Sequence, residues 1–137
     1  MSVEVQGVDS IVERLEGLVD EKKLYFALGK ACALVERSAK QKAPKGTGEL
    51  RNSITSKVEG DTGIVYTPLE YAPYVEFGTG LFAEKGGRKD VPRHYKDDKG
   101  EWHSTNGMEP QPFMRPALNE NREKIKRILK EGITAND

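Results

Sequence analysis

The chain has few of the side chains that form disulfides or bind metals, with one cysteine and two histidines in 137 residues. A single cysteine excludes an internal disulfide framework and a thiolate metal cluster within one chain. Lysine and arginine number 22, as do aspartate and glutamate, so the formal net charge is zero. The chain therefore lacks the net positive charge whose electrostatic field attracts nucleic acid to basic domains. No apolar run approaches the roughly 18 residues of a membrane span, so we expect no membrane partner.

The apolar content is also low, since hydrophobic residues make up 36% of the chain. Globular chains usually hold roughly 45–50%, although that average counts glycine and this figure does not. The length fits one domain over residues 1–137, because domains usually run to about 100–200 residues. We expect a modest core that buried surface from neighbouring subunits would help to stabilise. The first four residues do not start a basic-then-apolar signal sequence, so we expect synthesis in the cytoplasm.

The first third of the chain predicts a short strand and two helices. Apolar and polar residues alternate over Ser2–Gln6, as in a half-buried strand. An apolar stripe predicts a helix over about residues 9–19. A longer helix follows Asp20, because apolar residues recur there at spacings of three and four. Pro44 ends this helix, since the residue before a proline avoids helical backbone angles.

The middle of the chain predicts a hairpin, with turn residues over Gly60–Gly63 between two strand-like runs. Residues Tyr71–Phe77 predict either a single helical turn or a bent strand, which Gly78 ends. The chain closes with one helix that has Pro116 in its first turn and an apolar stripe along one side. These elements predict an α+β fold, in which a small antiparallel sheet packs against a long N-terminal helix and a C-terminal helix.

Residues 81–109 are rich in glycine, lysine, aspartate and histidine, and they predict an extended loop or hairpin insertion. Arg93–Lys96 and Glu101–Ser104 flank Asp97–Gly100, which suits a second hairpin. Long loops in small domains are usually functional or disordered.

Several patterns resemble catalytic or metal sites, and the simpler interpretation is favoured for each. Asp61-Thr62-Gly63 spells an aspartic-protease triplet, but a single copy in a predicted turn indicates turn chemistry. The glycines at 78–80 and 86–87 lack the lysine and following helix of a phosphate loop. Cys32 lies among apolar residues, which favours an inert packed thiol over a nucleophile. We expect no catalytic residue and no cofactor.

A metal site in the second hairpin is the alternative with the most candidate ligands. Imidazole and carboxylate groups stand close in sequence there, and the candidates are His94, Asp97, Asp98, Glu101 and His103. Their spacing matches no metal motif, so we expect a polar loop and no metal.

Three short motifs each combine a proline or glycine with apolar anchors and a charge, and so fix both a turn and what it buries. The first motif spans residues 43–54, the second 71–80 and the third 111–118. None of them holds a catalytic set, which favours a role in shape and assembly. The structural or interface candidates are Pro44, Gly46, Thr47, Gly48, Leu50, Arg51, Tyr71, Glu76, Gly78, Thr79, Pro112, Phe113, Arg115 and Pro116.

Glu76 lies between Val75 and Phe77, which predicts a half-buried carboxylate. An unpaired acid in that position would be costly, so we expect it to pair with Arg51 or Arg115.

In residue type and order the three motifs resemble the bacteriophage tail-component family described as head-tail joining, neck or tail-completion proteins, which includes minor tail protein Z. The family pattern is Ala-Pro after a long helix, then Thr-Gly-x-Leu-Arg-x-Ser-Ile, Tyr-Ala-x-x-Val-Glu-x-Gly-Thr and Gln-Pro-Phe-x-x-Pro-Ala before a final helix. In this chain these are Ala43-Pro44, Thr47 to Ile54, Tyr71 to Thr79 and Gln111 to Ala117. The resemblance spans about Ala31 to Leu129.

The resemblance implies a structural protein of a long-tailed phage virion that joins the tail tube to the head connector. It implies a homo-oligomeric ring, expected to be a hexamer, made in the host cytoplasm and found in the tail or neck of the virion. The implied partners are the head connector and the tail tube or tail terminator proteins, with DNA only passing through the ring. A tail terminator or a head-closure protein is the alternative at the same junction. Alternatives from other classes are a nucleic-acid-binding module and a small metal-dependent hydrolase.

Overall fold

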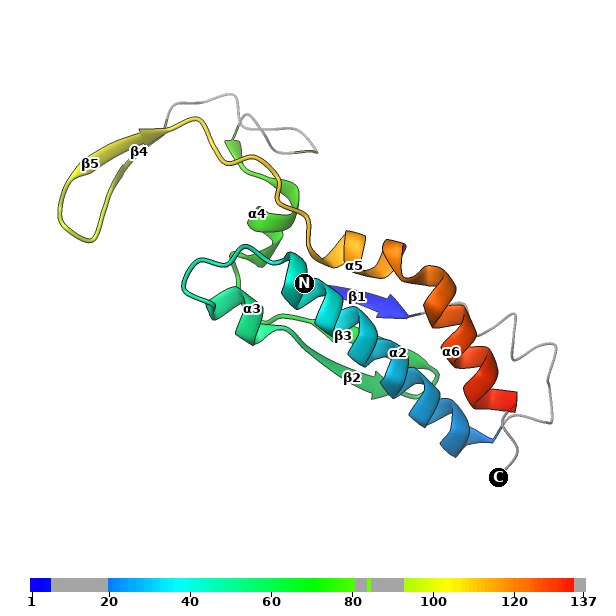
Figure 1. Cartoon of the computed structure of the whole chain (residues 1–137). Coiled ribbons are helices and arrows are strands. Elements are labelled where there is room, and N and C mark those ends of the chain that lie inside the picture. The colour runs from blue at the N-terminus through cyan, green and yellow to red at the C-terminus, as the bar shows by residue number, and fades with distance from the viewer. Residues whose placement is uncertain (6–19, 81–83, 85–92, 135–137) are drawn as a thin grey trace. The chain divides into compact units, whose positions relative to one another are not determined.

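The computed structural model describes residues 1–5, 20–80, 84 and 93–134. The chain forms two compact units (Figure 1). Unit 1 comprises residues 1–68 and 113–137, and unit 2 comprises residues 69–112. The single domain expected over residues 1–137 stays a prediction.

Unit 1 contains a three-stranded antiparallel sheet in the order β1-β3-β2. The strands are β1 (Ser2–Val5), β2 (Thr55–Glu59) and β3 (Thr62–Tyr66). The predicted hairpin is β2–β3, and its turn is shorter than expected because Thr62 already pairs with Glu59. The opening strand β1 is also confirmed, and it pairs with the far edge of β3. Val65 therefore lies at the centre of the sheet, opposite Val3 on one side and Ser56 on the other.

The long predicted helix is α2 (Glu21–Lys42), which crosses the sheet and contacts β2 and β3 (Figure 1). Asp20 caps its start, where the side-chain oxygen accepts a hydrogen bond from the Lys22 N–H at 2.8 Å. At its end the Ala43 N–H donates to the Ala39 carbonyl, and Pro44 follows. One face of α2 is buried, with Leu28, Ala31 and Val35 fully enclosed, so this helix supplies much of the core.

Two helices close unit 1, whereas the sequence predicted one. They are α5 (Met114–Glu120) and α6 (Arg122–Thr134), which both contact α2. The helix is interrupted at Asn121, which has φ −105° and ψ 8° and whose buried side chain donates to the Ala117 carbonyl at 2.7 Å. A side chain that satisfies the carbonyl four residues earlier competes with the backbone ladder, and this explains the break.

A short helix, α3 (Glu49–Ser53), was not predicted. The chain makes this helical turn immediately before β2 begins. The helix predicted over residues 9–19 lies outside the described residues.

Unit 2 contains one short helix and one hairpin. The helix α4 (Ala72–Phe77) settles the choice between a helical turn and a bent strand, and Gly78 ends it with φ 82°. The strands β4 (Arg93–Lys96) and β5 (Trp102–Thr105) form the second predicted hairpin. The α+β fold class is confirmed. In the part of the chain that the structure describes, no helix has the length and apolar character needed to cross a membrane.

Candidate assembly surfaces

The first motif forms the connection between α2 and β2 in unit 1. Gly48 adopts φ 82°, a left-handed conformation that glycine accepts without strain, immediately before α3. The Thr47 hydroxyl accepts a hydrogen bond from the Glu49 N–H at 3.3 Å. Leu50 is buried, and the Ser53 hydroxyl lies 2.7 Å from the hydroxyl of Thr67, which follows β3. The motif therefore ties a turn to the sheet, as its glycine and apolar anchor predicted.

The second motif joins the segment after α4 to the segment after β5 within unit 2. The Thr79 N–H donates to the Met108 carbonyl at 2.9 Å, and the Met108 N–H donates to the Thr79 hydroxyl at 2.8 Å. Gly80 and Gly107 both have positive φ and lie against each other's segment so closely that a Cβ on either would collide with backbone atoms. The chain crossing thus explains Gly80, and the end of α4 explains Gly78.

The third motif begins in unit 2 and ends in unit 1. In unit 2 the Gln111 N–H donates to the Val75 carbonyl at 2.8 Å, so the start of this motif is joined to the second motif. In unit 1 Phe113, Met114 and Ala117 are fully buried, and they anchor α5. The sequence order of the motifs gave no indication that the second and third would share hydrogen bonds.

The predicted site residues divide into three groups by their burial. The enclosed ones are Leu50, Glu76, Gly78 and Phe113. The partly buried ones are Pro44, Gly48, Thr79, Arg115 and Pro116. The exposed ones are Gly46, Thr47, Arg51, Tyr71 and Pro112.

Glu76 is more deeply buried than predicted, with 0% of its surface exposed. It lies in unit 2, whereas Arg51 and Arg115 lie in unit 1. The expected ion pair stays a prediction.

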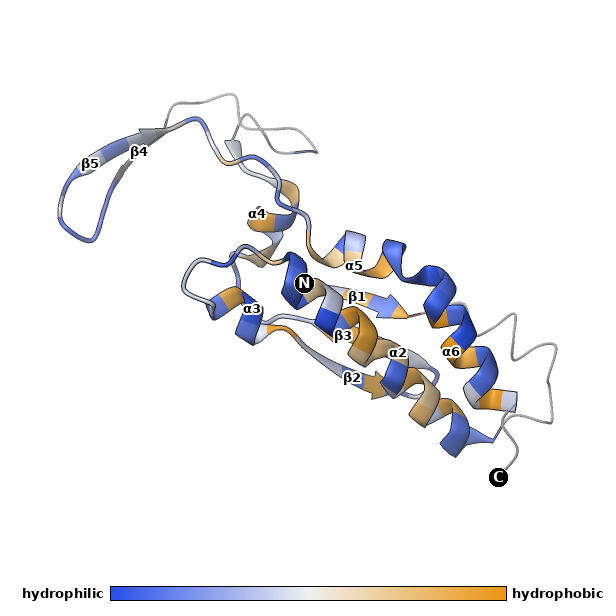
Figure 2. Ribbon diagram, in the orientation of Figure 1, coloured by the Kyte–Doolittle hydropathy of each residue, from blue (hydrophilic) through white to orange (hydrophobic). Residues whose placement is uncertain are grey.

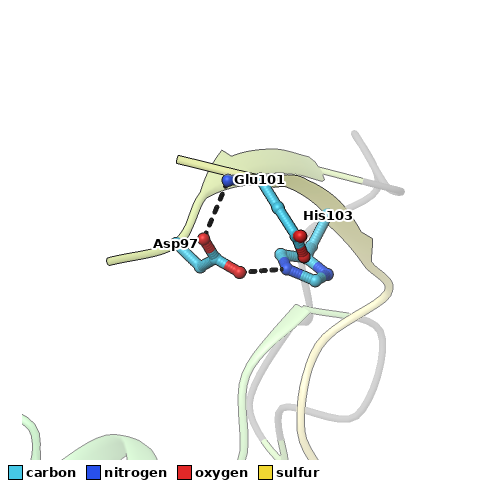
Figure 3. A group of neighbouring side chains, drawn as sticks. All are labelled: Asp97, Glu101 and His103. Carbon is cyan, nitrogen blue, oxygen red and sulfur yellow. Dashed lines mark hydrogen bonds and ion pairs between the residues drawn. The ribbon is translucent and has the colours of Figure 1, made fainter. Parts of the chain in front are cut away.

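Three of the five candidate metal ligands come together at the end of the β4–β5 hairpin (Figure 3). One ligand atom each from Asp97, Glu101 and His103 lies within 4.8 Å of the others. His94 and Asp98 are exposed, and neither belongs to this group within the described residues.

Hydrogen bonds within the hairpin account for the position of Asp97. One carboxylate oxygen accepts from the N–H groups of Lys99 at 2.9 Å and Glu101 at 2.8 Å, and the other lies 2.6 Å from His103 Nε2 (Figure 3). The His103 contact, followed by these backbone N–H groups, lowers the pKa of Asp97 below its ordinary value. The arrangement is that of a side chain closing a turn. The expectation of no metal in this hairpin stays a prediction.

Two exposed aromatic surfaces were missed in the sequence. Trp102 of β5 is 71% exposed, and Tyr25 and Phe26 of α2 are 56% and 67% exposed. The helical spacing of the buried residues of α2 already placed Tyr25 and Phe26 off the core face, so this surface was predictable. No such signal marked Trp102, because a lone tryptophan in a polar segment fits either face of a hairpin.

The side chains suspected of catalysis have structural roles. Burial, followed by the charge of nearby Glu36, raises the pKa of the Cys32 thiol to about 11, so it stays protonated and unreactive at neutral pH. Asp61 lies in the β2–β3 turn, and Gly63 packs so closely against the Cys32 sulfur that there is no room for a Cβ. The Asp61-Thr62-Gly63 triplet is therefore explained by a turn and a close helix-to-sheet contact.

Comparison with protein families gives one match, over residues 9–78, to a family described as "Bacteriophage HK97-gp10, putative tail-component". The match covers more than half of the chain and includes the first motif and nearly all of the second, while the third lies beyond it. No curated protein and no solved structure matches the chain. This family match supports a structural tail component of a phage virion that contacts other virion proteins. The buried anchor residues of the three motifs are consistent with a structural role. The chain belongs to the HK97-gp10-like family of bacteriophage tail components.

Proposed function

We propose that this tail component is a tail-completion or neck protein that joins the tail tube to the head connector. The family match carries the proposal, because it identifies a tail component and covers the first and nearly all of the second of the three motifs that resemble joining proteins. The protein acts in this proposal as a homo-oligomeric ring, with a hexamer expected, and DNA passes through the ring without being read. It works by shape alone and is not an enzyme.

The distribution of buried and exposed residues supports a ring subunit. Such a subunit needs a rigid body and at least two different surfaces for its neighbours, because a closed ring is built from head-to-tail contacts. The body is unit 1, whose sheet and α2 share one core. The exposed positions of the first motif and the β4–β5 hairpin are available to neighbouring subunits or to the layers above and below.

Electron microscopy of lysates from a phage that lacks this protein tests the proposal. Unattached heads beside finished tails of normal length are the expected result. Overlong tails would instead identify a tail terminator, and heads that have lost their DNA would identify a head-closure protein. Normal infectious particles would contradict every version of the proposal.

A further inference from the structure

The sheet of unit 1 ends in two strands that each pair on one side. Its order is β1-β3-β2, and among the residues that the structure describes no strand pairs with the outer edge of β1 or of β2 (Figure 1). The outer edge of a strand carries backbone N–H and C=O groups that a further strand can bind. These two edges belong to different strands, so a contact between them is head-to-tail, as a closed ring of copies requires.

The directions of the two edge strands suit such a contact. β1 and β2 run in the same direction, because each is antiparallel to β3. A second copy that extends the sheet in the same orientation therefore places its β1 beside β2 of the first copy, with the two strands parallel. In a parallel pair, one residue bonds to the two residues that flank its neighbour on the other strand.

The backbone groups on the two outer edges have the alternation that this pairing needs. The N–H of Thr67, which follows β3, donates to the Met1 carbonyl at 3.1 Å. Since successive residues bond to opposite sides of a strand, Glu4 then directs its N–H and C=O groups to the outer edge of β1. The same alternation through β3 directs those of Ser56 and Val58 to the outer edge of β2. Glu4 of one copy can therefore donate to the Ser56 carbonyl of another and accept from its Val58 N–H.

The charged side chains of the two edges match in the same register. Glu4 and Lys57 occupy one row across the sheet, each opposite Ile64. Extension of that row places the Lys57 ammonium beside the Glu4 carboxylate of the next copy, and both side chains are exposed. Opposite charges on adjacent strands stabilise a sheet. Lys57 already contacts Glu59 at 2.9 Å, and an ammonium group with three donors can bind a second carboxylate.

The apolar side chains on the opposite face match as well. Val5 and Val58 occupy the row of Gly63, each on one side of it. This face is the one that α2 covers, because a Cβ on Gly63 would meet the Cys32 sulfur. Val5 is buried, whereas Val58 is half-buried. Extension of the row places Val58 beside Val5 of the next copy and removes further apolar surface from water.

We propose that β1 of one copy pairs in parallel with β2 of a second copy of this chain, so that their sheets become continuous. The backbone alternation, the Glu4–Lys57 pair and the Val5–Val58 pair each select the same strand direction and the same register. The inference rests on the proposed ring and names the edges that join its subunits. It uses unit 1 alone, so the β4–β5 hairpin stays available to other proteins of the junction.

Disulfide trapping tests this pairing with the full chain. Ser2 and Thr55 share the row of Tyr66, so Ser2→Cys and Thr55→Cys lie on neighbouring strands of two copies, about 4.8 Å apart and within disulfide reach. Within one chain β3 separates them by about 10 Å, which is beyond that reach. The double variant should give a ladder of covalent multimers on a non-reducing denaturing gel after mild oxidation, and each single variant should stay a monomer. Native Cys32 is buried and does not compete.

A matched control tests the register. Ser2→Cys combined with Glu59→Cys uses the same two edges and the same face of the sheet. Glu59 lies four residues along β2 from Thr55, a distance of about 13 Å. This pair should therefore give no ladder.

Charge substitutions test whether β1 of a second copy is the strand that binds. Adding Glu4→Lys to the Ser2 and Thr55 cysteine pair should weaken the ladder about tenfold, because two ammonium groups then face each other. Adding Lys57→Glu as well should restore the ladder, since the pair forms again with its charges exchanged. Circular dichroism of each variant checks that the fold is retained.

The experiment is run on purified protein at high concentration and on phage particles. Absence of the ladder in both samples overturns the inference, as does an equal ladder in the Glu59 control or a ladder that Glu4→Lys leaves unchanged. In those cases, heads and tails that fail to join without the protein still support the proposed function. A ladder in the purified protein together with absence of the chain from particles supports the pairing and contradicts the proposed function.

Discussion

Units 1 and 2 are stabilised in different ways. Unit 1 buries large apolar side chains from the sheet and from the four helices α2, α3, α5 and α6. In unit 2 the buried apolar side chains among the described residues are Ala72 and Val75, and its order comes from backbone hydrogen bonds between crossing segments. The β4–β5 hairpin is mostly polar along its length (Figure 2). A two-stranded hairpin is at best marginally stable in water without packing. Unit 1 therefore has the character of a scaffold, and unit 2 has little apolar core of its own among the described residues; in the proposed function, unit 2 is the part that meets neighbouring proteins.

The largest difference between the units should appear when one aromatic side chain is removed from each. Phe113→Ala empties a fully buried site in unit 1, and we expect it to lower the free energy of unfolding by about 3–5 kcal/mol. Trp102→Ala removes an exposed side chain from unit 2 and should change that free energy by no more than about 0.5 kcal/mol. Urea unfolding measures both. Equal losses would remove the distinction between scaffold and surface.

Much of the fold of both units could be predicted from sequence, because the helices and hairpins carry local signals. The periodicity and the caps of α2 predicted its bounds closely, and turn residues predicted both hairpins. The order β1-β3-β2 could not be predicted, since strand pairing across 60 residues depends on long-range packing. The break at Asn121 was missed because the apolar stripe continues across it.

The candidate surfaces were harder to predict than the fold. The crossing of Gly80 with Gly107 arises only when distant segments meet, and the sequence of the hairpin did not show which face Trp102 would take. Of the five residues of the metal alternative, Asp97, Glu101 and His103 gather in the hairpin, whereas His94 and Asp98 stay outside the group among the described residues.

A second test asks whether Glu76 forms the ion pair that the sequence predicts. If the buried carboxylate pairs with Arg115 or Arg51, Glu76→Gln and the matching Arg→Ala should show a coupling of about 0.5–3 kcal/mol in a double-mutant cycle. Measuring unfolding free energies for both arginines identifies the partner. Simple additivity with each arginine would rule the ion pair out.

A third test probes the close contact between α2 and the sheet. Gly63→Ala puts a methyl group onto the Cys32 sulfur and should destabilise unit 1 by about 1–3 kcal/mol. Cys32→Ala in the same chain should restore part of that loss, because it removes the sulfur that the methyl group meets.

Gly29→Ala is the matched control for that contact. It lies within α2 with no atom within 4 Å of the added methyl group, so it should stabilise the protein by up to about 1 kcal/mol. A destabilising Gly29→Ala, or a neutral Gly63→Ala, would contradict the packing described for this face.

The smallest expected effect concerns the hairpin turn of unit 2. NMR titration of Asp97 should give a pKa below the ordinary value, and His103→Ala should raise it toward that value because the largest cause of the shift is removed. A lowered pKa means that this carboxylate favours the folded turn while it is ionised, and the contribution is lost as pH falls through the pKa in the folded state. An unchanged pKa in His103→Ala would show that the backbone N–H groups alone hold the carboxylate.

Replacement of the hairpin, residues 93–105, by a short glycine linker tests the central claim most directly. Phage carrying this variant are examined by electron microscopy, and the unfolding of the purified variant is followed in urea. The account predicts that unit 1 keeps its stability while heads and tails fail to join. Infectious particles with joined heads and tails, or a variant whose unit 1 no longer folds, would contradict it.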